Sequence, residues 1–270
     1  MAADMEGING VVNWDQVRPG HPEYERFRHL MTAEVNAAIS GAVEAGVEDI
    51  LVSDGHNAKT NLLIEELDNR ARLNTGSPAP FAMVQGIDQG VDAAIFIGYH
   101  ARSGQSNAVL SHTWDKTTIA NLWLNGLLVG EIGLNAALCG HFGVPVLMIA
   151  GDQAACNEAK ELLHPIENVA VKIAQGRYSA ECLPLAVSQA RIQTAARRAI
   201  ETFRAGLGQE PFKIQTPVEL VVELKGPEMA DQAALMPGST RHENLKISFS
   251  SPDMPAVYQA FRTIALLAAA

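Results

Sequence analysis

The sequence has few cysteines, and their pattern excludes two kinds of site. Cys139, Cys156 and Cys182 are widely spaced, and none belongs to a C-x-x-C pair. An odd number at such spacing does not suit a disulfide framework or a thiolate metal site. If this protein binds a metal, histidine and carboxylate side chains must supply the ligands.

Positive charge is also scarce. The chain contains 20 Lys and Arg against 30 Asp and Glu, a formal net charge of −10. It has no Lys/Arg-rich run, so nothing would neutralise a phosphate backbone or hold an anionic membrane surface. We therefore expect no nucleic-acid partner and no membrane partner.

Long hydrophobic runs and several familiar motifs are absent. The apolar runs are shorter than the roughly 20 residues that cross a bilayer, and the start, MAADMEG, has no basic region followed by an apolar stretch. We expect a cytoplasmic protein. Glycine-rich phosphate motifs, G-x-S-x-G and H-E-x-x-H do not occur, which counts against nucleotide binding, serine hydrolase chemistry and the commonest zinc-protease plan.

What the sequence does contain is the composition of a folded globular protein. Of its 270 residues, 47% are hydrophobic and 19% are charged, which is an ordinary balance for a protein with a buried core. This length suits one large domain or two small ones.

Hydrophobic periodicity alternates between helical and strand patterns. Continuous apolar runs at 93–98 and 145–150 are typical of parallel strands with helices on both faces. Asn125-Gly126 predicts a type I′ hairpin turn between strands 119–124 and 127–129. Helical spacing predicts helices over 22–45, 130–141, 152–163, 185–205 and from 254 onward. Short apolar runs predict further strands over 49–53, 218–224 and 245–249. We predict an α/β protein with a mostly parallel central sheet flanked by helices.

The segment 206–217 is rich in Gly, Pro and polar residues, as a linker or a loop would be. We expect residues 1–182 to form a metal-binding catalytic α/β domain. Residues 183–270 are expected to form a smaller C-terminal α/β domain involved in oligomer contacts.

Ligand-type side chains follow the ends of predicted strands. Asp4 and Glu6 end the first strand, where positions two apart project to the same side. His56 and His100 each follow a later strand, and the carboxyl edge of a parallel sheet is where α/β proteins place their sites. Glu131 opens a helix, where the helix dipole favours a carboxylate. We expect these five side chains to converge.

Five such residues suffice for two divalent ions if one carboxylate bridges them, because three protein ligands per ion leave a position open for water. Two cations facing three carboxylates would favour a bound hydroxide, the nucleophile that a peptidase or amidase needs. Each residue taken singly also has an ordinary alternative role. Asp4 and Glu6 would cap a turn, the histidines would be loop residues, and Glu131 would be a helix-start carboxylate.

His112 is a candidate for proton transfer. It lies in the strand-like run Val109–Trp114 before the predicted hairpin, from which it could donate or accept a proton beside the site. The alternative is a buried, hydrogen-bonded histidine. The remaining five histidines have no matching carboxylate pattern, so we expect them to be structural or solvated.

Five short segments carry these residues in a fixed order: Asp4-Met5-Glu6-Gly7, Ser53-Asp54-Gly55-His56-Asn57, Gly98-Tyr99-His100-Ala101-Arg102, Ser111-His112 and Gly130-Glu131-Ile132-Gly133-Leu134-Asn135. Together they closely resemble the D-aminopeptidase family of dinuclear zinc peptidases, of the dipeptide-transport-associated type. The resemblance extends through 145–152 and reaches 235–238, so it covers essentially the whole chain.

The resemblance implies two Zn²⁺ per subunit, or Mn²⁺ or Co²⁺ in their place. Asp4 would bridge, with Glu6 and His100 on one ion and His56 and Glu131 on the other. It also implies an aminopeptidase that releases N-terminal D-amino acids, D-alanine foremost, from short peptides or amides by a zinc-activated hydroxide with the assistance of His112. The implied assembly is a homo-oligomer, a decamer that encloses the active sites.

Two other functions use the same residues. A dinuclear amidohydrolase or phosphoesterase needs similar ligands. The motifs have no cluster of Arg or Lys near them, which weighs against a phosphate substrate. A non-catalytic, metal-stabilised assembly would keep the fold without the chemistry, but His112 and all five ligand positions are intact. Only Met1, Ala2 and Ala3 precede Asp4, so we expect a short first strand with its α-amino group close to the carboxylates.

Overall fold

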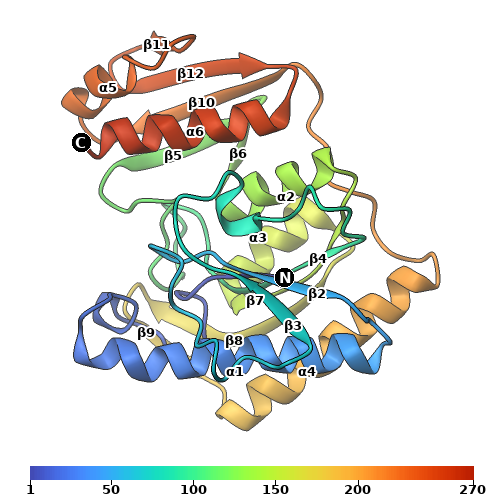
Figure 1. Cartoon of the computed structure of the whole chain (residues 1–270). Coiled ribbons are helices and arrows are strands. Elements are labelled where there is room, and N and C mark those ends of the chain that lie inside the picture. The colour runs from blue at the N-terminus through green and yellow to red at the C-terminus, as the bar shows by residue number, and fades with distance from the viewer.

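A seven-stranded sheet forms the centre of the protein, which is described by a computed structural model covering residues 1–270. Its strands lie in the order β3-β2-β1-β4-β7-β8-β9 (Figure 1). Every neighbouring pair is parallel except β8 and β9. The strands are β1 (Ala2–Ala3), β2 (Ile50–Asp54), β3 (Ala71–Asn74), β4 (Ala94–Tyr99), β7 (Val146–Asp152), β8 (Glu167–Gly176) and β9 (Ser179–Cys182). The predicted α/β class with a mostly parallel sheet is confirmed.

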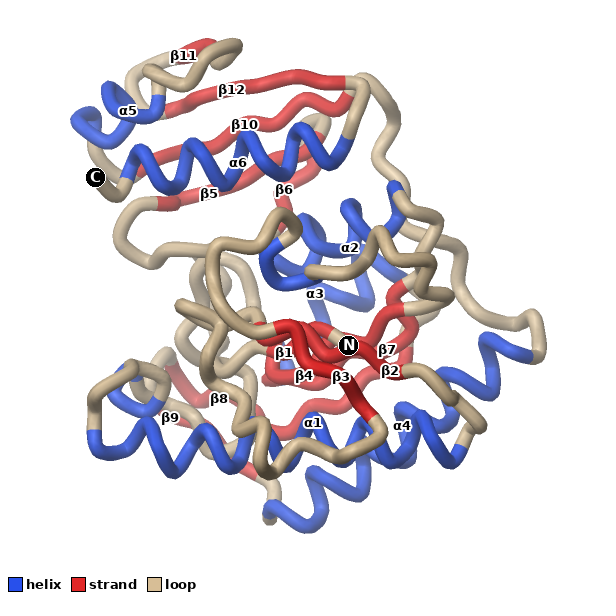
Figure 2. Tube along the Cα trace, viewed as in Figure 1, coloured by secondary structure: helices blue, strands red, loops and turns tan.

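Four helices cover the two faces of this sheet (Figure 2). The long helices α1 (Pro22–Glu44) and α4 (Leu185–Arg204) lie together on one face, and α2 (Glu131–His141) and α3 (Gln153–Leu163) lie on the other. Strands β4 and β7 are buried along their whole length between these layers. That double burial explains the continuous apolar runs, because neither face of these strands meets water.

A second sheet is antiparallel, in the order β11-β12-β10-β5-β6. It contains β5 (Ile119–Leu124), β6 (Leu127–Val129), β10 (Val218–Leu224), β11 (Thr240–His242) and β12 (Lys246–Ser251), accompanied by α5 (Pro227–Ala233) and α6 (Met254–Ala268). The turn between β5 and β6 has φ of 48° at Asn125 and 77° at Gly126. Two successive positive φ angles are the signature of a type I′ turn, so the predicted hairpin is confirmed.

The two sheets do not follow the expected division at residues 182 and 183. Strand β5 pairs with β10, with Leu124 opposite Leu220, so the hairpin of the first segment is part of the C-terminal sheet. Helix α4, from the second segment, packs against α1 and β8 of the first sheet. The hairpin and α4 thus each pack with the sheet of the other segment, which buries apolar faces that would otherwise be exposed to water.

Other sequence expectations differ locally from the structure. The run Val109–Trp114 is an irregular turn and not a strand, with positive φ angles at Leu110 and Trp114. Strand β8 was not expected, since its alternation is interrupted by a buried lysine, Lys172. None of the helices is both long enough and apolar enough to span a lipid bilayer.

The first strand is short, as expected, but the α-amino group lies elsewhere. Strand β1 contains only Ala2 and Ala3, which pair with Ser53 and Asp54 of β2. The amino group of Met1 donates a hydrogen bond to the carbonyl oxygen of Leu51 at 2.6 Å. The expectation of an amino group beside the site carboxylates is therefore wrong, because the parallel register turns it toward the start of β2.

Candidate metal centre

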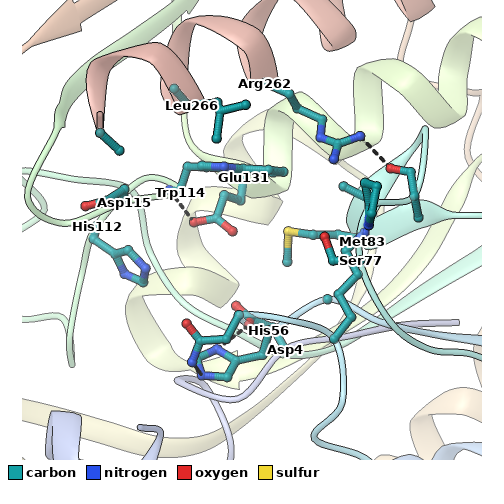
Figure 3. Close-up of a pocket in the computed structure, with 18 of the residues that line it drawn as sticks. Asp4, His56, Ser77, Met83, His112, Trp114, Asp115, Glu131, Arg262 and Leu266 are labelled. Atoms are coloured by element: carbon teal, nitrogen blue, oxygen red, sulfur yellow. Dashed lines mark hydrogen bonds and ion pairs between the residues drawn. The ribbon is translucent and has the colours of Figure 1, made fainter. Parts of the chain in front are cut away.

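The six residues singled out in the sequence lie at one edge of the central sheet and line one cavity of about 960 Å³ (Figure 3). Asp4 and Glu6 follow β1, His56 follows β2, His100 follows β4 and Glu131 is the first residue of α2. These five side chains are only 2–6% exposed. Ligand-type side chains from four separate segments are thus buried together at the carboxyl ends of parallel strands.

A close approach of two backbone segments shapes this edge. Asp4 N donates to Ile97 O at 2.8 Å, and Gly7 N donates to Gly98 O at 2.7 Å. The register of β4 shifts between Ile97 and Tyr99, and Gly98 has a φ of 71°. A Cβ atom at Gly98 would lie 2.1 Å from Asp4 O. Glycine is therefore required at this bulge, which redirects the chain just before His100.

Asp4 lies between two histidines. His56 Nδ1 is 3.4 Å from one Asp4 oxygen and His100 Nε2 is 3.4 Å from the other. His56 Nδ1 is also 3.0 Å from Glu6, and His100 Nε2 is 3.2 Å from Glu131. Asp4 Oδ2 and Glu6 Oε2 are buried without a hydrogen-bond partner. Buried carboxylate oxygens that lack a donor, beside imidazole nitrogens, are a donor set that fits divalent zinc.

The backbone fixes the second nitrogen of each ring. His56 Nε2 is 2.7 Å from Val17 O and His100 Nδ1 is 3.0 Å from Ala101 O. Glu131 Oε1 accepts a hydrogen bond from Trp114 N at 2.7 Å. A ring N–H that donates to a carbonyl leaves the opposite nitrogen free to act as a ligand. The free nitrogens, His56 Nδ1 and His100 Nε2, are the ones that face the carboxylates.

The resemblance assigns one set of ligands to each ion, and the structure fits one of these two sets better than the other. Donor atoms of Asp4, Glu6 and His100 lie within 4.8 Å of one another. In the other set, His56 lies beside Asp4, whereas Glu131 lies against His100. The assignment of ligands to individual ions stays a prediction.

The cluster carries a strong negative potential. Burial raises the pKa of Asp4 to about 7, and the adjacent negative charge of Glu6 adds to this effect. Burial alone would lower the pKa of His56 and His100, but the surrounding carboxylates together outweigh it, Glu6 with Asp4 at His56 and Glu131 with Asp4 and Glu6 at His100, so both pKa values are raised. Carboxylates that favour imidazolium so strongly favour a divalent cation for the same electrostatic reason.

His112 lies beside the five candidate ligand residues. Its ring stacks on His100 with centroids 4.0 Å apart and planes 12° apart, and the edge of Trp14 contacts it. His112 Nδ1 is 2.9 Å from Leu110 O, and its Nε2 is 3.8 Å from Glu6. Burial, helped by the positive charge of His100, lowers the pKa of His112 to about 4. A neutral ring that donates through Nδ1 has its lone pair on Nε2, facing the site.

Several cavity residues were not expected from the sequence. Trp114 and Asp115 come from the irregular turn after His112, Lys59 comes from the loop after β2, and Arg262 and Leu266 come from α6. Figure 3 shows Arg262 and Leu266 above the cavity, with Asp4 and His56 on its other side. No local motif marks these residues, because the three segments that carry them are far apart in the chain.

Comparison with known proteins identifies the family. The family model described as D-aminopeptidase matches residues 1–263. The chain belongs to the D-aminopeptidase family. It is 35% identical to the D-aminopeptidase of Bacillus subtilis (strain 168) over 272 residues, which cover 99% of this chain and 96% of that protein. The solved structure of the Zn-dependent D-aminopeptidase DppA from Bacillus subtilis, a self-compartmentalizing protease, matches with a TM-score of 0.95 and 35% identity, over 100% of this chain and 97% of DppA.

Membership of the D-aminopeptidase family confirms three predictions: the family itself, the α/β fold and a metal-dependent hydrolase of the aminopeptidase type. It also counts against the alternative of a non-catalytic, metal-stabilised assembly. The site residues, the number of ions, the preference for D-alanine and the decamer stay predictions.

Proposed function

We propose that this D-aminopeptidase family member binds two Zn²⁺ per subunit, with Mn²⁺ or Co²⁺ able to replace them, through Asp4, Glu6, His56, His100 and Glu131. It would release N-terminal D-amino acids, D-alanine foremost, from short peptides or amides. The observation that carries this proposal is the buried cluster itself, in which two carboxylate oxygens lack any hydrogen-bond donor at the wall of a substrate-sized cavity.

Zinc bound there would polarise the scissile carbonyl and lower the pKa of a water molecule, which supplies a nucleophile at neutral pH. The residues of the chain orient and move protons around that centre. His112 has its Nδ1 at Leu110 O and its Nε2 toward the carboxylates, so Nε2 is placed to accept a proton and to deliver it to the leaving amine.

The test is a panel of matched L- and D-dipeptides and D-amino acid amides, assayed with zinc, manganese and cobalt. We expect hydrolysis of D-alanyl substrates, two equivalents of metal per chain, and complete loss of activity in excess chelator with recovery when zinc is added back. Full activity in the chelator would contradict the metal mechanism. Equal rates for matched L- and D-substrates would contradict the stereochemical part of the proposal.

We further propose that the chain assembles into a homo-oligomer, a decamer, that admits short peptides. The support is the likeness to DppA, which is a self-compartmentalizing protease. Analytical ultracentrifugation should give ten times the 28.9 kDa chain mass. A monomer at micromolar concentration would rule this assembly out. The cytoplasmic location also stays a prediction, which cell fractionation would test.

A further inference from the structure

Lys59 is a buried lysine whose ammonium group has no hydrogen-bond or ion-pair partner. The side chain is 5% exposed, and its Nζ atom has no hydrogen-bond partner. It lines the same cavity as the metal centre. None of the ion pairs of the protein includes Lys59. Burial of an ammonium group without a partner destabilises the fold, so a buried, unpaired lysine indicates a functional role.

The only other fully buried lysine shows what a structural role requires. Lys172 of β8 donates to three backbone carbonyl oxygens, those of Glu6, Ile8 and Val11, at 2.6–2.8 Å. All three protons of its ammonium group are thereby satisfied. Lys59 has none of this compensation, so a structural explanation that accounts for Lys172 does not account for Lys59.

The backbone holds Lys59 in an unusual conformation. Its φ is +62°, in the left-handed region that side chains other than glycine seldom adopt. Lys59 N donates to His56 O at 2.8 Å, and Lys59 O accepts hydrogen bonds from Gly76 N and Thr75 Oγ1 at 2.7 and 2.6 Å. Strained residues that the surroundings hold in place cluster at binding sites.

A second cation faces the cavity from the opposite element. Arg262 of α6 donates through Nη1 to the carbonyl oxygens of Ala79 and Pro80, and it has no carboxylate partner. Burial and the nearby charge of Arg262 lower the pKa of Lys59 to about 8. The two cations therefore repel each other, and an anion between them would remove that repulsion.

The cavity thus has an acidic wall, formed by the metal ligands, and two unpaired cations. A short peptide has a matching distribution of groups, because its N-terminal residue must reach the metal centre and its C-terminus is a carboxylate at neutral pH. A volume of about 960 Å³ is within the range of small-molecule sites, which suits a peptide of very few residues.

We propose that Lys59 and Arg262 bind the C-terminal carboxylate of short peptide substrates, which makes the enzyme selective for free-acid peptides of two or three residues. This inference rests on the proposed function, whose peptide bond is placed at the metal centre. Guanidinium and ammonium groups are the usual partners of carboxylates in buried sites.

The test compares D-Ala-D-Ala with its C-terminal carboxamide, using the zinc-loaded full-length enzyme. We expect kcat/KM to be about 10- to 100-fold higher for the acid, the range for a hydrogen bond to a charged group. Lys59→Met should remove most of this preference, because it should lower kcat/KM for the acid, mainly through KM, much more than kcat/KM for the carboxamide. Arg262→Gln should act in the same direction. The matched control is Lys160→Met, which removes an exposed lysine on α3 and should change neither rate.

A binding measurement separates failure of this inference from failure of the proposed function. Isothermal titration calorimetry would use D-Ala-D-Ala analogues with a CH₂–NH link in place of the peptide bond, in acid and carboxamide forms. Tighter binding of the acid that Lys59→Met abolishes would support the carboxylate subsite even if no peptide were hydrolysed. Equal binding of the two forms to the wild type, or an equal loss of both in Lys59→Met, would overturn the subsite while leaving the aminopeptidase intact.

Discussion

The three histidines of the proposed metal centre differ in what their free ring nitrogen faces. Each has one nitrogen next to a backbone carbonyl oxygen. The other nitrogen of His56 and of His100 is within 3.4 Å of at least one carboxylate, whereas His112 Nε2 is 3.8 Å from Glu6. Closer contact with the carboxylates suits a ligand, and the longer distance leaves His112 free to exchange a proton.

His112→Ala should lower kcat by about 100- to 10,000-fold, the usual loss for a general acid or base, while zinc content stays the same. The ring lies beside the ligands and is not expected to hold an ion. Zinc per chain would be measured by atomic absorption, and His29→Ala, an exposed histidine on α1, serves as the control. Unchanged turnover would remove His112 from the mechanism.

Glu34 is a buried carboxyl group outside the metal centre. Its Oε1 accepts a hydrogen bond from Asn9 N at 3.1 Å, and its Oε2 has no partner. Burial raises the pKa of Glu34 to about 7. The native state therefore holds this proton more tightly than the unfolded chain, where the pKa is about 4.3. Below the unfolded-state pKa, Glu34 is protonated in both states and its ionisation costs no stability. The loss of stability grows as the pH rises from that value toward 7 and is constant at higher pH.

Glu34→Gln should consequently raise the free energy of unfolding relative to wild type at pH 8, by at most about 3 kcal/mol, with little difference at pH 4.5. Urea denaturation at the two pH values measures this. The control is Glu65→Gln, at an exposed position on the loop after β2, which should change the free energy of unfolding equally at both pH values. A variant no more stable than wild type at pH 8 would show that Glu34 ionises at little cost.

Among the elements, the irregular segment after β1 depends on distant contacts for its shape. It carries Asp4 and Glu6 but has no regular hydrogen bonding of its own. Gly7 packs against Gly98 on one side, and Lys172 of β8 binds three of its carbonyl oxygens on the other. This segment therefore owes its geometry to β4 and β8, and we expect Lys172 to act as a positioning residue for Glu6.

Lys172→Met keeps the length of the side chain and removes its three hydrogen bonds. We expect zinc affinity to fall by about 10- to 100-fold, the usual effect of losing support behind a metal ligand. Added zinc should restore much of the activity, which a general loss of folding would not allow. Chelator competition gives the affinity, and an affinity equal to that of wild type would refute a positioning role.

For the whole molecule, the cavity lies between the edge of the central sheet and α6 of the C-terminal sheet. A buried chain of polar groups joins the two parts. Tyr258 of α6 donates to Asn135 Oδ1 at 2.9 Å, and Asn135 Nδ2 donates to the hydroxyl oxygen of Tyr99 at 3.1 Å. All three residues are fully buried, so this connection fixes how α6, with Arg262, sits over the metal centre.

Tyr258→Phe should lower the free energy of unfolding by about 1–3 kcal/mol, because it leaves Asn135 Oδ1 buried without a donor. Urea denaturation would measure the change, with Tyr178→Phe, an exposed tyrosine (59%), as the control. A loss no larger than that of the control would mean that the hydrogen bond of Tyr258 contributes little to holding the two parts together.

Local patterns in the sequence were enough to predict five of the six α-helices, most strands, the hairpin and the convergence of the five ligand-type side chains. Helical and strand periodicity arises from residues that are neighbours along the chain, and Asn125-Gly126 selects its turn through backbone sterics alone. The ligand-type residues were visible because each directly follows a strand or opens a helix, and parallel strands bring their carboxyl ends to one edge.

Tertiary structure alone decided the exchange of the β5–β6 hairpin and α4 between the two sheets, the irregular path around His112, and the presence of Lys59 and Arg262 in one cavity. These features depend on which apolar faces find each other across long stretches of chain, and no short window of sequence records that choice. The five proposed metal ligands follow from the pattern of the chain, whereas Arg262 reaches the cavity that they line only because of how α6 packs.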